Sequence, residues 1–282
     1  MTEQDICVCG AGTMGRGIAH VAAAAGFNTV LYEPSEAVLQ CAREAIHGNL
    51  KKLVAKEKLT AEKAETLFTK IHFTTDLQQC KAAIIIEAIV EKPDVKIALF
   101  NQLAAINTPQ TIFASNTSSL SVSQMAAQIK NSERVAGLHF FNPAPVMKLV
   151  EVVRGRDTAD DVIQTLISFV QKAGKTAVVC RDAPGFIVNR VARPYYIEAL
   201  RLAEENTVSF ETADRLLEAV GFKLGPFKLM DLIGNDINYA VSCSVHEQLG
   251  KPERLRPSLL QKEKVDSGAL GKKTGRGYYN YQ

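Results

Sequence analysis

The 282-residue sequence lacks several features that would assign it to a specialised class of protein. Its net charge is only +3, from 33 basic and 30 acidic residues, so it has no large excess of charge for binding nucleic acid or an anionic membrane. Its apolar runs, such as 22–25 and 82–86, fall far short of the ~20 residues of a membrane-spanning helix. We therefore predict a protein that binds neither nucleic acid nor membrane.

Cysteine is also scarce, with six residues at positions 7, 9, 41, 80, 180 and 243. A chain long enough to bury a large core does not need disulfides, which favours a reduced, cytoplasmic protein. The first predicted strand begins at Asp5, and we expect no signal segment before it. Cys7 and Cys9 form a C-x-C pattern, but we expect their side chains on opposite faces of a strand. Core packing is therefore favoured, and no metal site is predicted.

The first two thirds of the chain alternate short β-branched runs with longer helical patterns, which is typical of parallel βαβ units. Most runs are apolar nearly throughout, as strands covered on both faces must be. A helical pattern at 158–172 separates the last two runs, so the sheet is expected to be mixed at one edge. The predicted strands are 5–9, 29–32, 82–88, 111–115, 134–140, 148–153 and 176–180.

From residue 183 onward the pattern is helical only. Pro184, Pro226 and Pro257 each suit the first turn of a helix, where the missing N–H is not needed. The fold class that we predict is α/β, with a Rossmann-type dinucleotide-binding domain over residues 1–182 followed by an all-α domain over residues 183–282. The helices predicted in the second domain are 184–205, 210–219, 226–249 and 257–267.

The segment after the first predicted strand has the spacing of a dinucleotide-binding loop, G-x-G-x-x-G. Gly10 permits a tight turn, Gly12 lets the backbone approach a pyrophosphate, and Gly15 allows the helix to pack close to the strand. The pyrophosphate would rest on the helix N-terminus, where free N–H groups and the dipole favour an anion. The alternative is a tight turn that binds no ligand.

Glu33 stands at the end of the second predicted strand, eighteen residues after Gly15. A carboxylate there can accept hydrogen bonds from the adenosine ribose and would repel a 2′-phosphate, which favours NAD over NADP. The alternative is a solvated residue at a strand end.

His139 is the histidine that falls at the carboxyl end of a predicted strand, where open α/β sheets bind their ligands. Glu151 lies in the apolar run 148–153 of the next strand, where a buried carboxylate needs a partner. Paired, the two residues form a general base with a fixed ring orientation, and alcohol oxidation by a nicotinamide requires such a base for the hydroxyl proton. The alternatives are a surface carboxylate on an edge strand and a hydrogen-bonded core histidine.

Two further polar segments are candidates for substrate contacts. Residues 115–119, Ser-Asn-Thr-Ser-Ser, end the fourth predicted strand and can hydrogen-bond a substrate hydroxyl or the nicotinamide amide, or can instead cap a helix. Asn189 opens the helical region and can polarise a substrate carbonyl, or can instead form a hydrogen bond between domains.

Five sequence runs, in order, cover nearly the whole chain: GAGTMGRGIA at 10–19, SNTSSL at 115–120, GLHFFNPAPVMKLVEVV at 137–153, DAPGFIVNR at 182–190 and GKKTGRGYYNY at 271–281. With these runs the chain resembles the 3-hydroxyacyl-CoA dehydrogenase family, in particular its single-unit bacterial 3-hydroxybutyryl-CoA dehydrogenases. The resemblance implies NAD-dependent, reversible oxidation of an (S)-3-hydroxyacyl-CoA to the 3-ketoacyl-CoA in fatty acid metabolism. It also implies a homodimer formed through the C-terminal helical domain.

The resemblance assigns roles to particular residues of this sequence. It puts the family's catalytic pair on His139 and Glu151, and its substrate-contacting serine and asparagine, which we also count as catalytic, on Ser118 and Asn189. Asn142 matches another active-site position and is expected to bind substrate. The residues expected to bind NAD are Gly10, Gly12, Thr13, Met14, Gly15, Glu33, Glu91 and Asn116.

Two features go beyond the common pattern of such a domain. The helical stretch 37–70 is longer than a βαβ crossover requires, and it carries Lys51, Lys52, Lys56 and Lys58. In the resembled family this helical pair contacts coenzyme A, whose phosphates suit lysine, and we select Lys56 as the contact; the alternative is a solvated charged face. The family commonly ends its second strand with Asp, and the longer Glu33 is expected to keep the preference for NAD.

Other interpretations stay open at this point. A dehydrogenase of the 3-hydroxyisobutyrate or 6-phosphogluconate type would use a lysine at the start of the helical domain, where GFIVNRVARP has none. A crystallin-like sugar-acid dehydrogenase shares the His–Glu pair but takes no coenzyme A, and a non-catalytic NAD-binding dimer would not need the pair. Among thioesters, longer 3-hydroxyacyl chains and 3-hydroxyadipyl-CoA are alternatives to 3-hydroxybutyryl-CoA, and Arg190 and Arg193 are candidates to hold a distal carboxylate.

Overall fold

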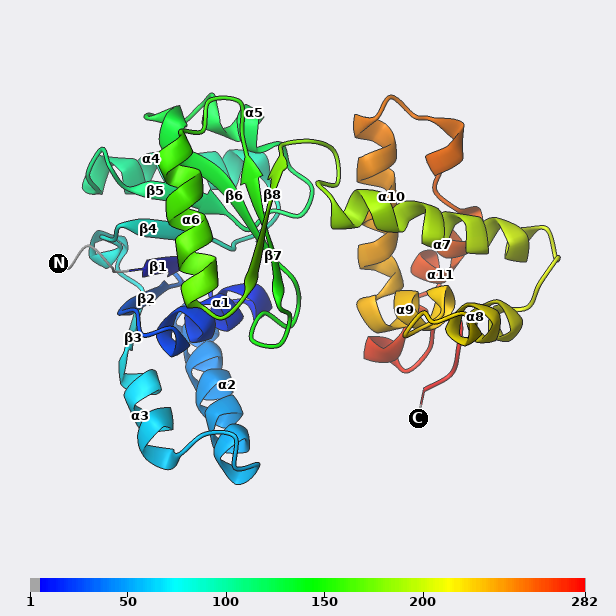
Figure 1. Cartoon of the computed structure of the whole chain (residues 1–282), viewed down its shortest axis with the longest axis horizontal. Coiled ribbons are helices and arrows are strands. Elements are labelled where there is room, and N and C mark those ends of the chain that lie inside the picture. Colours follow the sequence, from blue (N-terminus) through cyan, green and yellow to red (C-terminus); the bar gives the residue numbers. More distant parts are fainter. Residues whose placement is uncertain (1–5, 282) are drawn as a thin grey trace. The chain divides into compact units, whose positions relative to one another are not determined.

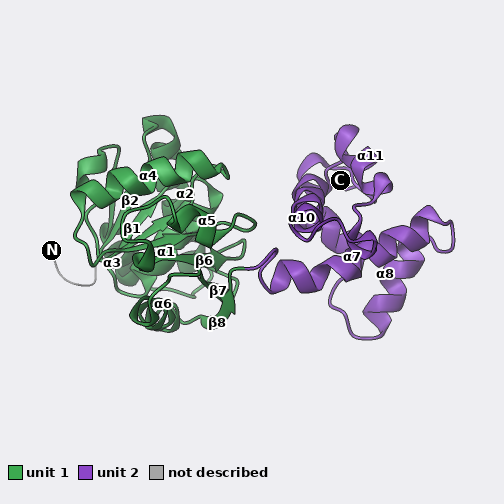
Figure 2. Cartoon of the chain, turned by 90° about the horizontal axis from the view of Figure 1, so that it is seen from above, with its two compact units in different colours: residues 1–182 green, residues 183–282 purple. Residues whose placement is uncertain are grey.

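The computed structural model describes residues 6–281, and the chain divides into two compact units (Figure 2). Unit 1 comprises residues 1–182 and unit 2 comprises residues 183–282. The predicted start of the first strand, Asp5, lies outside the described residues. Within the described residues, no helix combines the length and the apolar composition that crossing a membrane demands.

Unit 1 is built on one eight-stranded sheet (Figure 1). Its strands are β1 (Ile6–Cys9), β2 (Thr29–Tyr32), β3 (Ile71–Thr74), β4 (Ile84–Glu87), β5 (Ile112–Ser115), β6 (Val135–Phe140), β7 (Leu149–Arg154) and β8 (Thr176–Arg181). Their order in the sheet is β3-β2-β1-β4-β5-β6-β7-β8, and neighbours are parallel except β6 and β7, so the sheet is mixed toward one edge, as predicted. From β1 the chain adds β2 and β3 on one side of β1, and it then crosses back to add β4 on the other side. Ligands bind at the carboxyl ends of the strands beside such a switch point.

Helices cover both faces of this sheet. They are α1 (Thr13–Ala24), α2 (Glu36–Ala55), α3 (Ala61–Thr69), α4 (Pro93–Ile106), α5 (Val122–Ala126) and α6 (Asp160–Lys172), with the 3-10 turns η1 (Leu77–Gln79) and η2 (Ser132–Arg134). Ile6 and Val8 of β1 pack in the larger core with apolar residues of α1, α2, α3 and α6. Phe100 of α4 packs against Phe113 of β5, with ring centroids 5.5 Å apart. Burial on both faces explains why the central strands are apolar nearly throughout.

Unit 2 consists of helices around a smaller aromatic core. The helices are α7 (Val188–Glu204), α8 (Phe210–Ala219), α9 (Pro226–Ile233), α10 (Asn235–Gln248) and α11 (Leu259–Asp266), with the 3-10 turns η3 (Glu253–Leu255) and η4 (Lys272–Thr274). The buried carboxylate of Asp231 accepts hydrogen bonds from the backbone N–H groups of Tyr278 and Tyr279, at 3.0 Å each. A Cβ at Gly277 would overlap this carboxylate, so glycine is required there. The run at 271–281 therefore closes the core of unit 2.

Several elements differ from their prediction. Strand β3 was not predicted, because it has four residues and two of them carry exposed or half-buried side chains at the sheet edge. The predicted helix 226–249 is interrupted at Gly234, whose φ of 105° breaks the helical path. Of the three prolines assigned to a first helical turn, Pro226 alone occupies one; Pro184 lies in a turn before α7, and Pro257 precedes the N-cap of α11.

The expectation that Cys7 and Cys9 point to opposite faces is wrong. Successive residues of a strand alternate between faces, so residues two apart share one face. The Sγ atoms of these cysteines are 3.8 Å apart, and both side chains are buried. The argument that removed this pair from consideration as metal ligands therefore does not hold.

Candidate active site

The loop between β1 and α1 has the close backbone contacts that a dinucleotide fold needs. Gly10 has a φ of +99°, and a Cβ on it would press against the backbone at Ala88 after β4. A Cβ on Gly15 would overlap the carbonyl oxygen of Gly10, so glycine is required where the helix meets the strand. These constraints bring the start of α1 directly against the end of β1.

The N-terminus of α1 is built to receive an anion. Gly12 is the N-cap and has no side chain that could satisfy the first N–H groups of the helix. Gly12 and Thr13 are exposed, and Met14 is half-buried. Open N–H groups at a helix N-terminus, together with the helix dipole, suit the pyrophosphate of a dinucleotide. The glycine loop therefore fits NAD as its ligand.

Glu33 follows β2 and lies against the same loop. Its Oε2 accepts a hydrogen bond from the Ala11 N–H at 3.1 Å, and its Oε1 accepts one from the Ser35 N–H at 3.2 Å. The side chain is half-buried. These bonds hold a carboxylate beside the glycine turn, where the adenosine ribose of a bound dinucleotide is expected.

A buried lysine beside the end of β4 was not predicted from the sequence. Lys96 of α4 is 1% exposed, and its Nζ lies 2.7 and 2.8 Å from the two carboxylate oxygens of Glu87 and 2.9 Å from Glu91. The Ser115 hydroxyl donates to Glu87 as well, at 2.7 Å. Glu87 is a carboxylate at the end of an apolar strand, which is the signal that identified Glu151. The same reasoning would have predicted a buried cation here.

Glu91 connects this lysine to the serine-rich loop after β5. Its Oε1 accepts hydrogen bonds from the Ser118 N–H at 3.1 Å and from the Thr117 hydroxyl. Burial alone would raise the pKa of Glu91, but Lys96 and Thr117 hold that pKa below its ordinary value of 4.5. Glu91 and Ser118, predicted separately as NAD and substrate residues, therefore share one hydrogen-bonded network.

His139 and Glu151 are brought together, as the sequence predicts. They are direct partners in the antiparallel pair of β6 and β7. His139 Nδ1 lies 2.6 Å from Glu151 Oε2, and the two residues are 6% and 1% exposed. Nδ1–H donates to the carboxylate, which fixes the plane of the ring and makes the opposite nitrogen, Nε2, the candidate for proton transfer.

Asn116, directly after β5, forms a hydrogen bond with β6, the strand that contains His139. Its Oδ1 accepts a hydrogen bond from the Phe140 N–H at 2.8 Å. The serine-rich loop and His139 therefore stand at neighbouring strand ends, on the side of the sheet where the glycine loop also lies.

Three further predicted site residues are described by their places in the fold. Asn142 follows β6 on the surface of unit 1. Lys56 is exposed at the C-cap of α2. Asn189 is the second residue of α7 in unit 2 and is half-buried, and its carbonyl oxygen accepts a hydrogen bond from Arg193 Nε at 3.0 Å.

Arg193, a candidate for holding a distal carboxylate, is used inside unit 2. It is 3% exposed, and its Nη1 donates to the Asn238 carbonyl oxygen at 2.9 Å and to the Ser242 hydroxyl at 2.8 Å. Arg190 is half-buried near the start of the same helix. Of the two arginines, Arg190 is the better candidate for a substrate contact.

Comparison with known proteins gives matches over nearly the whole chain. Residues 5–183 match the family model described as the NAD-binding domain of 3-hydroxyacyl-CoA dehydrogenase, and residues 185–281 match the C-terminal domain of the same enzyme. The chain is 50% identical over 281 residues to the 3-hydroxyadipyl-CoA dehydrogenase of Escherichia coli K12, covering 99% of this chain but 59% of that protein. The chain thus spans about three fifths of that relative.

Other relatives match over their full length. A probable 3-hydroxybutyryl-CoA dehydrogenase of Deinococcus radiodurans is 40% identical, over 97% of this chain and 99% of that protein. The crystal structure of the (S)-3-hydroxybutyryl-CoA dehydrogenase of Ralstonia eutropha superposes with a TM-score of 0.95 at 36% identity, covering 100% of both chains. NAD is the cofactor of the N-terminal domain, and the glycine loop and Glu33 fit it. The chain belongs to the 3-hydroxyacyl-CoA dehydrogenase family of NAD-dependent oxidoreductases.

Proposed function

We propose that this chain oxidises the 3-hydroxyl of an (S)-3-hydroxyacyl-CoA to the 3-ketoacyl-CoA, and catalyses the reverse reaction, with 3-hydroxybutyryl-CoA as the reference substrate. The observation that carries the proposal is the buried hydrogen bond between His139 and Glu151, at a strand end on the ligand-binding side of a sheet that has an NAD loop. A non-catalytic NAD binder has no need of a buried imidazole–carboxylate pair, which is costly to bury.

The chemistry divides between the cofactor and the protein. NAD, when bound, supplies the acceptor for the hydride on C3. His139 Nε2 takes the proton of the 3-hydroxyl during oxidation and returns it during ketone reduction. Glu151 keeps the ring in place and stabilises its protonated form, because its carboxylate remains bonded to Nδ1 throughout.

The remaining site residues are assigned to binding and orientation. Ser118 is proposed to hydrogen-bond the reacting oxygen, and Asn142 and Asn189 to orient the thioester. Glu91 positions the Ser118 backbone, since its carboxylate accepts that N–H. Proton transfer requires the hydroxyl to lie within about 3 Å of the imidazole, so these polar contacts act by fixing the distance. The residues proposed to bind NAD are Gly10, Gly12, Thr13, Met14, Gly15, Glu33, Glu91 and Asn116.

The decisive experiment is NADH oxidation by the purified protein with three substrates: acetoacetyl-CoA, free acetoacetate and a longer 3-ketoacyl-CoA. We expect turnover with the thioesters only. The ratio of kcat/KM for the two thioesters then shows which acyl length the enzyme prefers. A His139→Gln enzyme should keep NADH binding and lose about 10²–10⁴-fold in kcat. Activity on free acetoacetate equal to that on the thioester would refute the CoA assignment, and full activity of His139→Gln would refute the role of the imidazole.

A second candidate substrate is 3-hydroxyadipyl-CoA, which is favoured by the 50% identity to the E. coli relative of that name. A dicarboxylic thioester needs a cation at its far end, and Arg190 is the residue we assign to it. Arg190→Met is then expected to reduce kcat/KM for 3-ketoadipyl-CoA by more than about 10-fold, the loss of one charge-assisted hydrogen bond, and to leave acetoacetyl-CoA nearly unaffected. An equal effect on both substrates would assign Arg190 to the fold instead.

The wider setting is proposed on the same basis. Residues 1–182 serve as the NAD-binding domain, and residues 183–282 serve in substrate binding and in forming a homodimer. Lys56, exposed at the end of α2, is proposed to contact a phosphate of coenzyme A. We place the enzyme in the cytoplasm and in fatty acid metabolism.

A further inference from the structure

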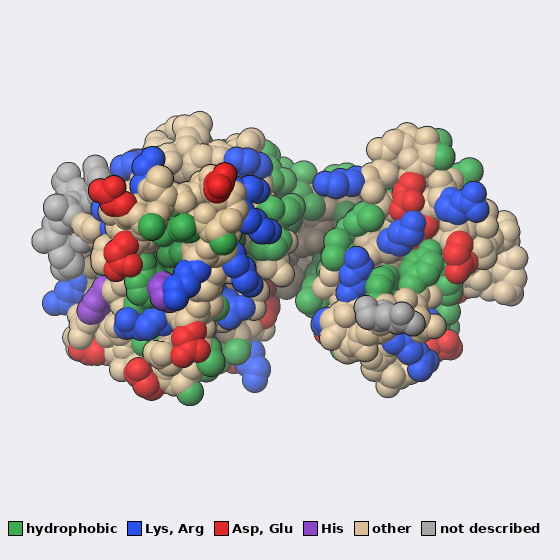
Figure 3. Space-filling model, turned by 90° about the horizontal axis from the view of Figure 1, so that it is seen from below, with side chains coloured by type: hydrophobic (Ala, Val, Ile, Leu, Met, Phe, Trp, Pro, Cys, Tyr) green, Lys and Arg blue, Asp and Glu red, His purple; other side chains and the backbone are tan. Residues whose placement is uncertain are grey.

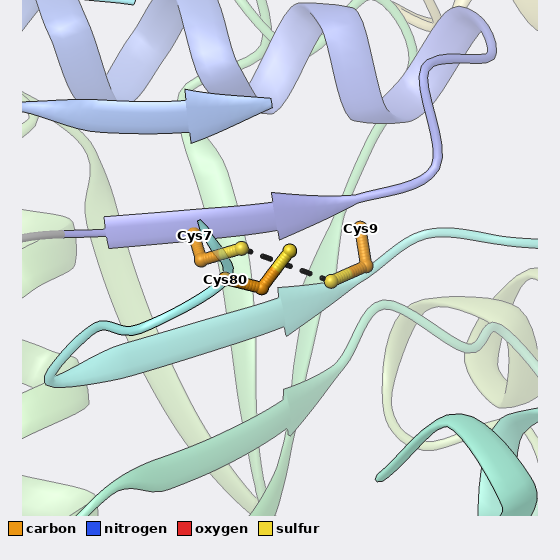
Figure 4. Close-up of side chains that lie close together, drawn as sticks. All are labelled: Cys7, Cys9 and Cys80. Carbon is orange, nitrogen blue, oxygen red and sulfur yellow. Dashed lines mark hydrogen bonds between the residues drawn. The ribbon is translucent and has the colours of Figure 1, made fainter. Parts of the chain in front are cut away.

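Cys7, Cys9 and Cys80 form a group of buried thiols that the proposed function does not use (Figure 4). Their Sγ atoms all lie within 4.8 Å of one another, and those of Cys7 and Cys9 are 3.8 Å apart. Each residue is 0% exposed. Two of these ligand-type side chains come from β1, and the third comes from the segment between η1 and β4, so the fold itself assembles the group.

The spacing is that of sulfur ligands around a single metal ion. A metal–sulfur bond of about 2.3 Å in a trigonal arrangement puts neighbouring sulfur atoms about 4.0 Å apart. The 3.8 Å between the Sγ atoms of Cys7 and Cys9 is close to this value, and Cys80 lies next to both (Figure 4).

Strand pairing and the side chain of Asn107 hold the three residues in place independently of any ion. β1 is paired with β2 on one side and with β4 on the other. Asn107, after α4, fixes the segment of the third cysteine: its Nδ2 donates to the Cys80 carbonyl oxygen at 2.8 Å, and its Oδ1 accepts from the Ala82 N–H at 3.0 Å. Ligands held on rigid elements need little reorganisation when an ion binds.

We propose that Cys7, Cys9 and Cys80 bind one soft, monovalent metal ion, and the ion that we expect is Cu(I). Three sulfur donors select a soft ion. Among the described residues no histidine or carboxylate joins the group, so it offers three ligands, whereas structural Zn²⁺ sites use four. Release of one thiol proton on binding a monovalent ion leaves the site without net charge, which burial at this depth favours.

A bound ion would join two segments of unit 1 next to the NAD loop. Cys9 is followed directly by Gly10, the glycine whose backbone turns against Ala88. An ion bound to Cys9 and Cys80 would link the end of β1 to the segment that precedes β4. We therefore expect Cu(I) to raise the Tm of the protein, because a ligand that binds only the folded state stabilises it.

The test supplies Cu(I) to the full-length protein under anaerobic, reducing conditions, in competition with a colorimetric Cu(I) chelator. We expect one tightly bound ion per chain, X-ray absorption with sulfur neighbours only, and a rise in Tm. Changes beyond the first ligands cost about 10–100-fold in metal affinity, so Cys80→Ser, which removes a ligand, is expected to cost about 100-fold or more. Cys41→Ser, at an exposed cysteine on α2, is the matched control and should bind as the wild type does.

Retained NADH binding and far-ultraviolet circular dichroism will establish that Cys80→Ser is folded; if it is not, Cys9→Ser and Cys9→Ala provide the same comparison from β1. Equal Cu(I) binding by wild type and Cys80→Ser would overturn the proposal. So would oxygen or nitrogen neighbours of the ion, or thiols that form a disulfide, seen as a loss of two hydrogens by mass spectrometry, without retaining metal.

Discussion

The carboxylate of Glu151 shows how one side chain in an unfavourable place sets the chemistry of another. It is 1% exposed and shares its environment with the apolar residues of β7, so an unpaired charge there would be strongly destabilising. The bond from His139 Nδ1, at 2.6 Å, satisfies it. The cost of burying the pair is offset by a ring whose orientation and tautomer are fixed before substrate arrives.

Glu151→Gln tests this division of roles. The amide can occupy the same space but cannot stabilise a protonated ring, so kcat is expected to fall by about 10²–10⁴-fold while the Kd for NADH stays within about 2-fold. Steady-state kinetics and fluorescence titration with NADH measure the two quantities. Unchanged kcat would mean that the carboxylate has only a structural role.

The glycine loop gives a second prediction for single residues. Gly15→Ala puts a methyl group onto the Gly10 carbonyl oxygen, so the loop must open, and NADH binding is expected to weaken by more than about 100-fold. Gly48→Ala is the matched control, because a Cβ there meets nothing within 4 Å in the middle of α2. It should leave NADH binding unchanged and stabilise the protein by about 0.5–1 kcal/mol in urea unfolding. Wild-type NADH affinity in Gly15→Ala would contradict the proposed loop geometry.

Single polar residues in apolar runs were predictable, but their partners were less so. Glu151 was assigned a partner because a histidine stood at the end of the neighbouring predicted strand. Glu87 carries the same signal, but its partner Lys96 lies on a helix, where a lysine ordinarily faces solvent. The expectation for the C-x-C pair was wrong for a simpler reason: side chains alternate along a strand with a period of two, so Cys7 and Cys9 share one face.

At the scale of elements, Lys96 joins α4 to β4 and to the loop that carries Glu91. Its ammonium contacts two carboxylates in a fully buried position. Lys96→Met would leave Glu87 charged and buried without its cation, and the free energy of unfolding is expected to fall by about 3–5 kcal/mol. Lys262→Met, which removes an exposed i,i+4 pair with Asp266 on α11, should cost about 0.5 kcal/mol or less.

A double variant separates two effects of Lys96→Met: the loss of the ion pair, and the cost of leaving the Glu87 carboxylate buried without a partner. Glu87→Leu combined with Lys96→Met buries no charge at either position, and it is expected to recover part of the stability that Lys96→Met loses. Urea unfolding of wild type, Lys96→Met, Glu87→Leu and the double variant measures this. Equal stability of Lys96→Met and wild type would show that the buried contacts are not maintained in solution.

Glu91 gives the pH dependence at this scale. Its pKa is held below the ordinary value of 4.5, so its charged form favours the folded state. The contribution is fully present above that ordinary value and is lost as the pH falls through the lower, folded-state pKa. The difference in unfolding free energy between wild type and Glu91→Gln is therefore expected to be constant near neutral pH and to shrink below pH 4.5. If the difference in unfolding free energy instead grew as the pH fell, the lowered pKa of Glu91 would be contradicted.

Element boundaries show where sequence patterns stop being informative. Buried parallel strands such as β4 and β5 were predicted within two residues, since an uninterrupted apolar run has few other interpretations. β3 was missed because an edge strand with an exposed histidine lacks that run. The break at Gly234 was missed because a glycine inside a helical pattern is often tolerated, and its positive φ is settled by packing.

On the scale of the whole molecule, the change from alternating runs to helices marks the point at which the chain passes from one compact unit to the other. Composition and periodicity were therefore sufficient to predict the division into an α/β part and a helical part. They could not predict which apolar residues lie at the surface, because an exposed apolar side chain has the same sequence pattern as a buried one. Unit 2 has many such residues at its surface, and Figure 3 shows part of this apolar surface among charged side chains.

The proposed homodimer gives the prediction for this scale. Leu216 in the last turn of α8 and Val220, the C-cap residue that follows it, are 65% and 69% exposed. They are four residues apart, so they lie on the same side of the helix end. Exposed apolar stripes of this kind are costly on a monomer and typical of subunit interfaces. Changing both residues to lysine is expected to convert a dimer into a monomer, measured by size-exclusion chromatography with light scattering. Val38→Lys, at an exposed valine of α2 in unit 1, should leave the dimer intact; a double variant that also stays dimeric would exclude α8 from the interface.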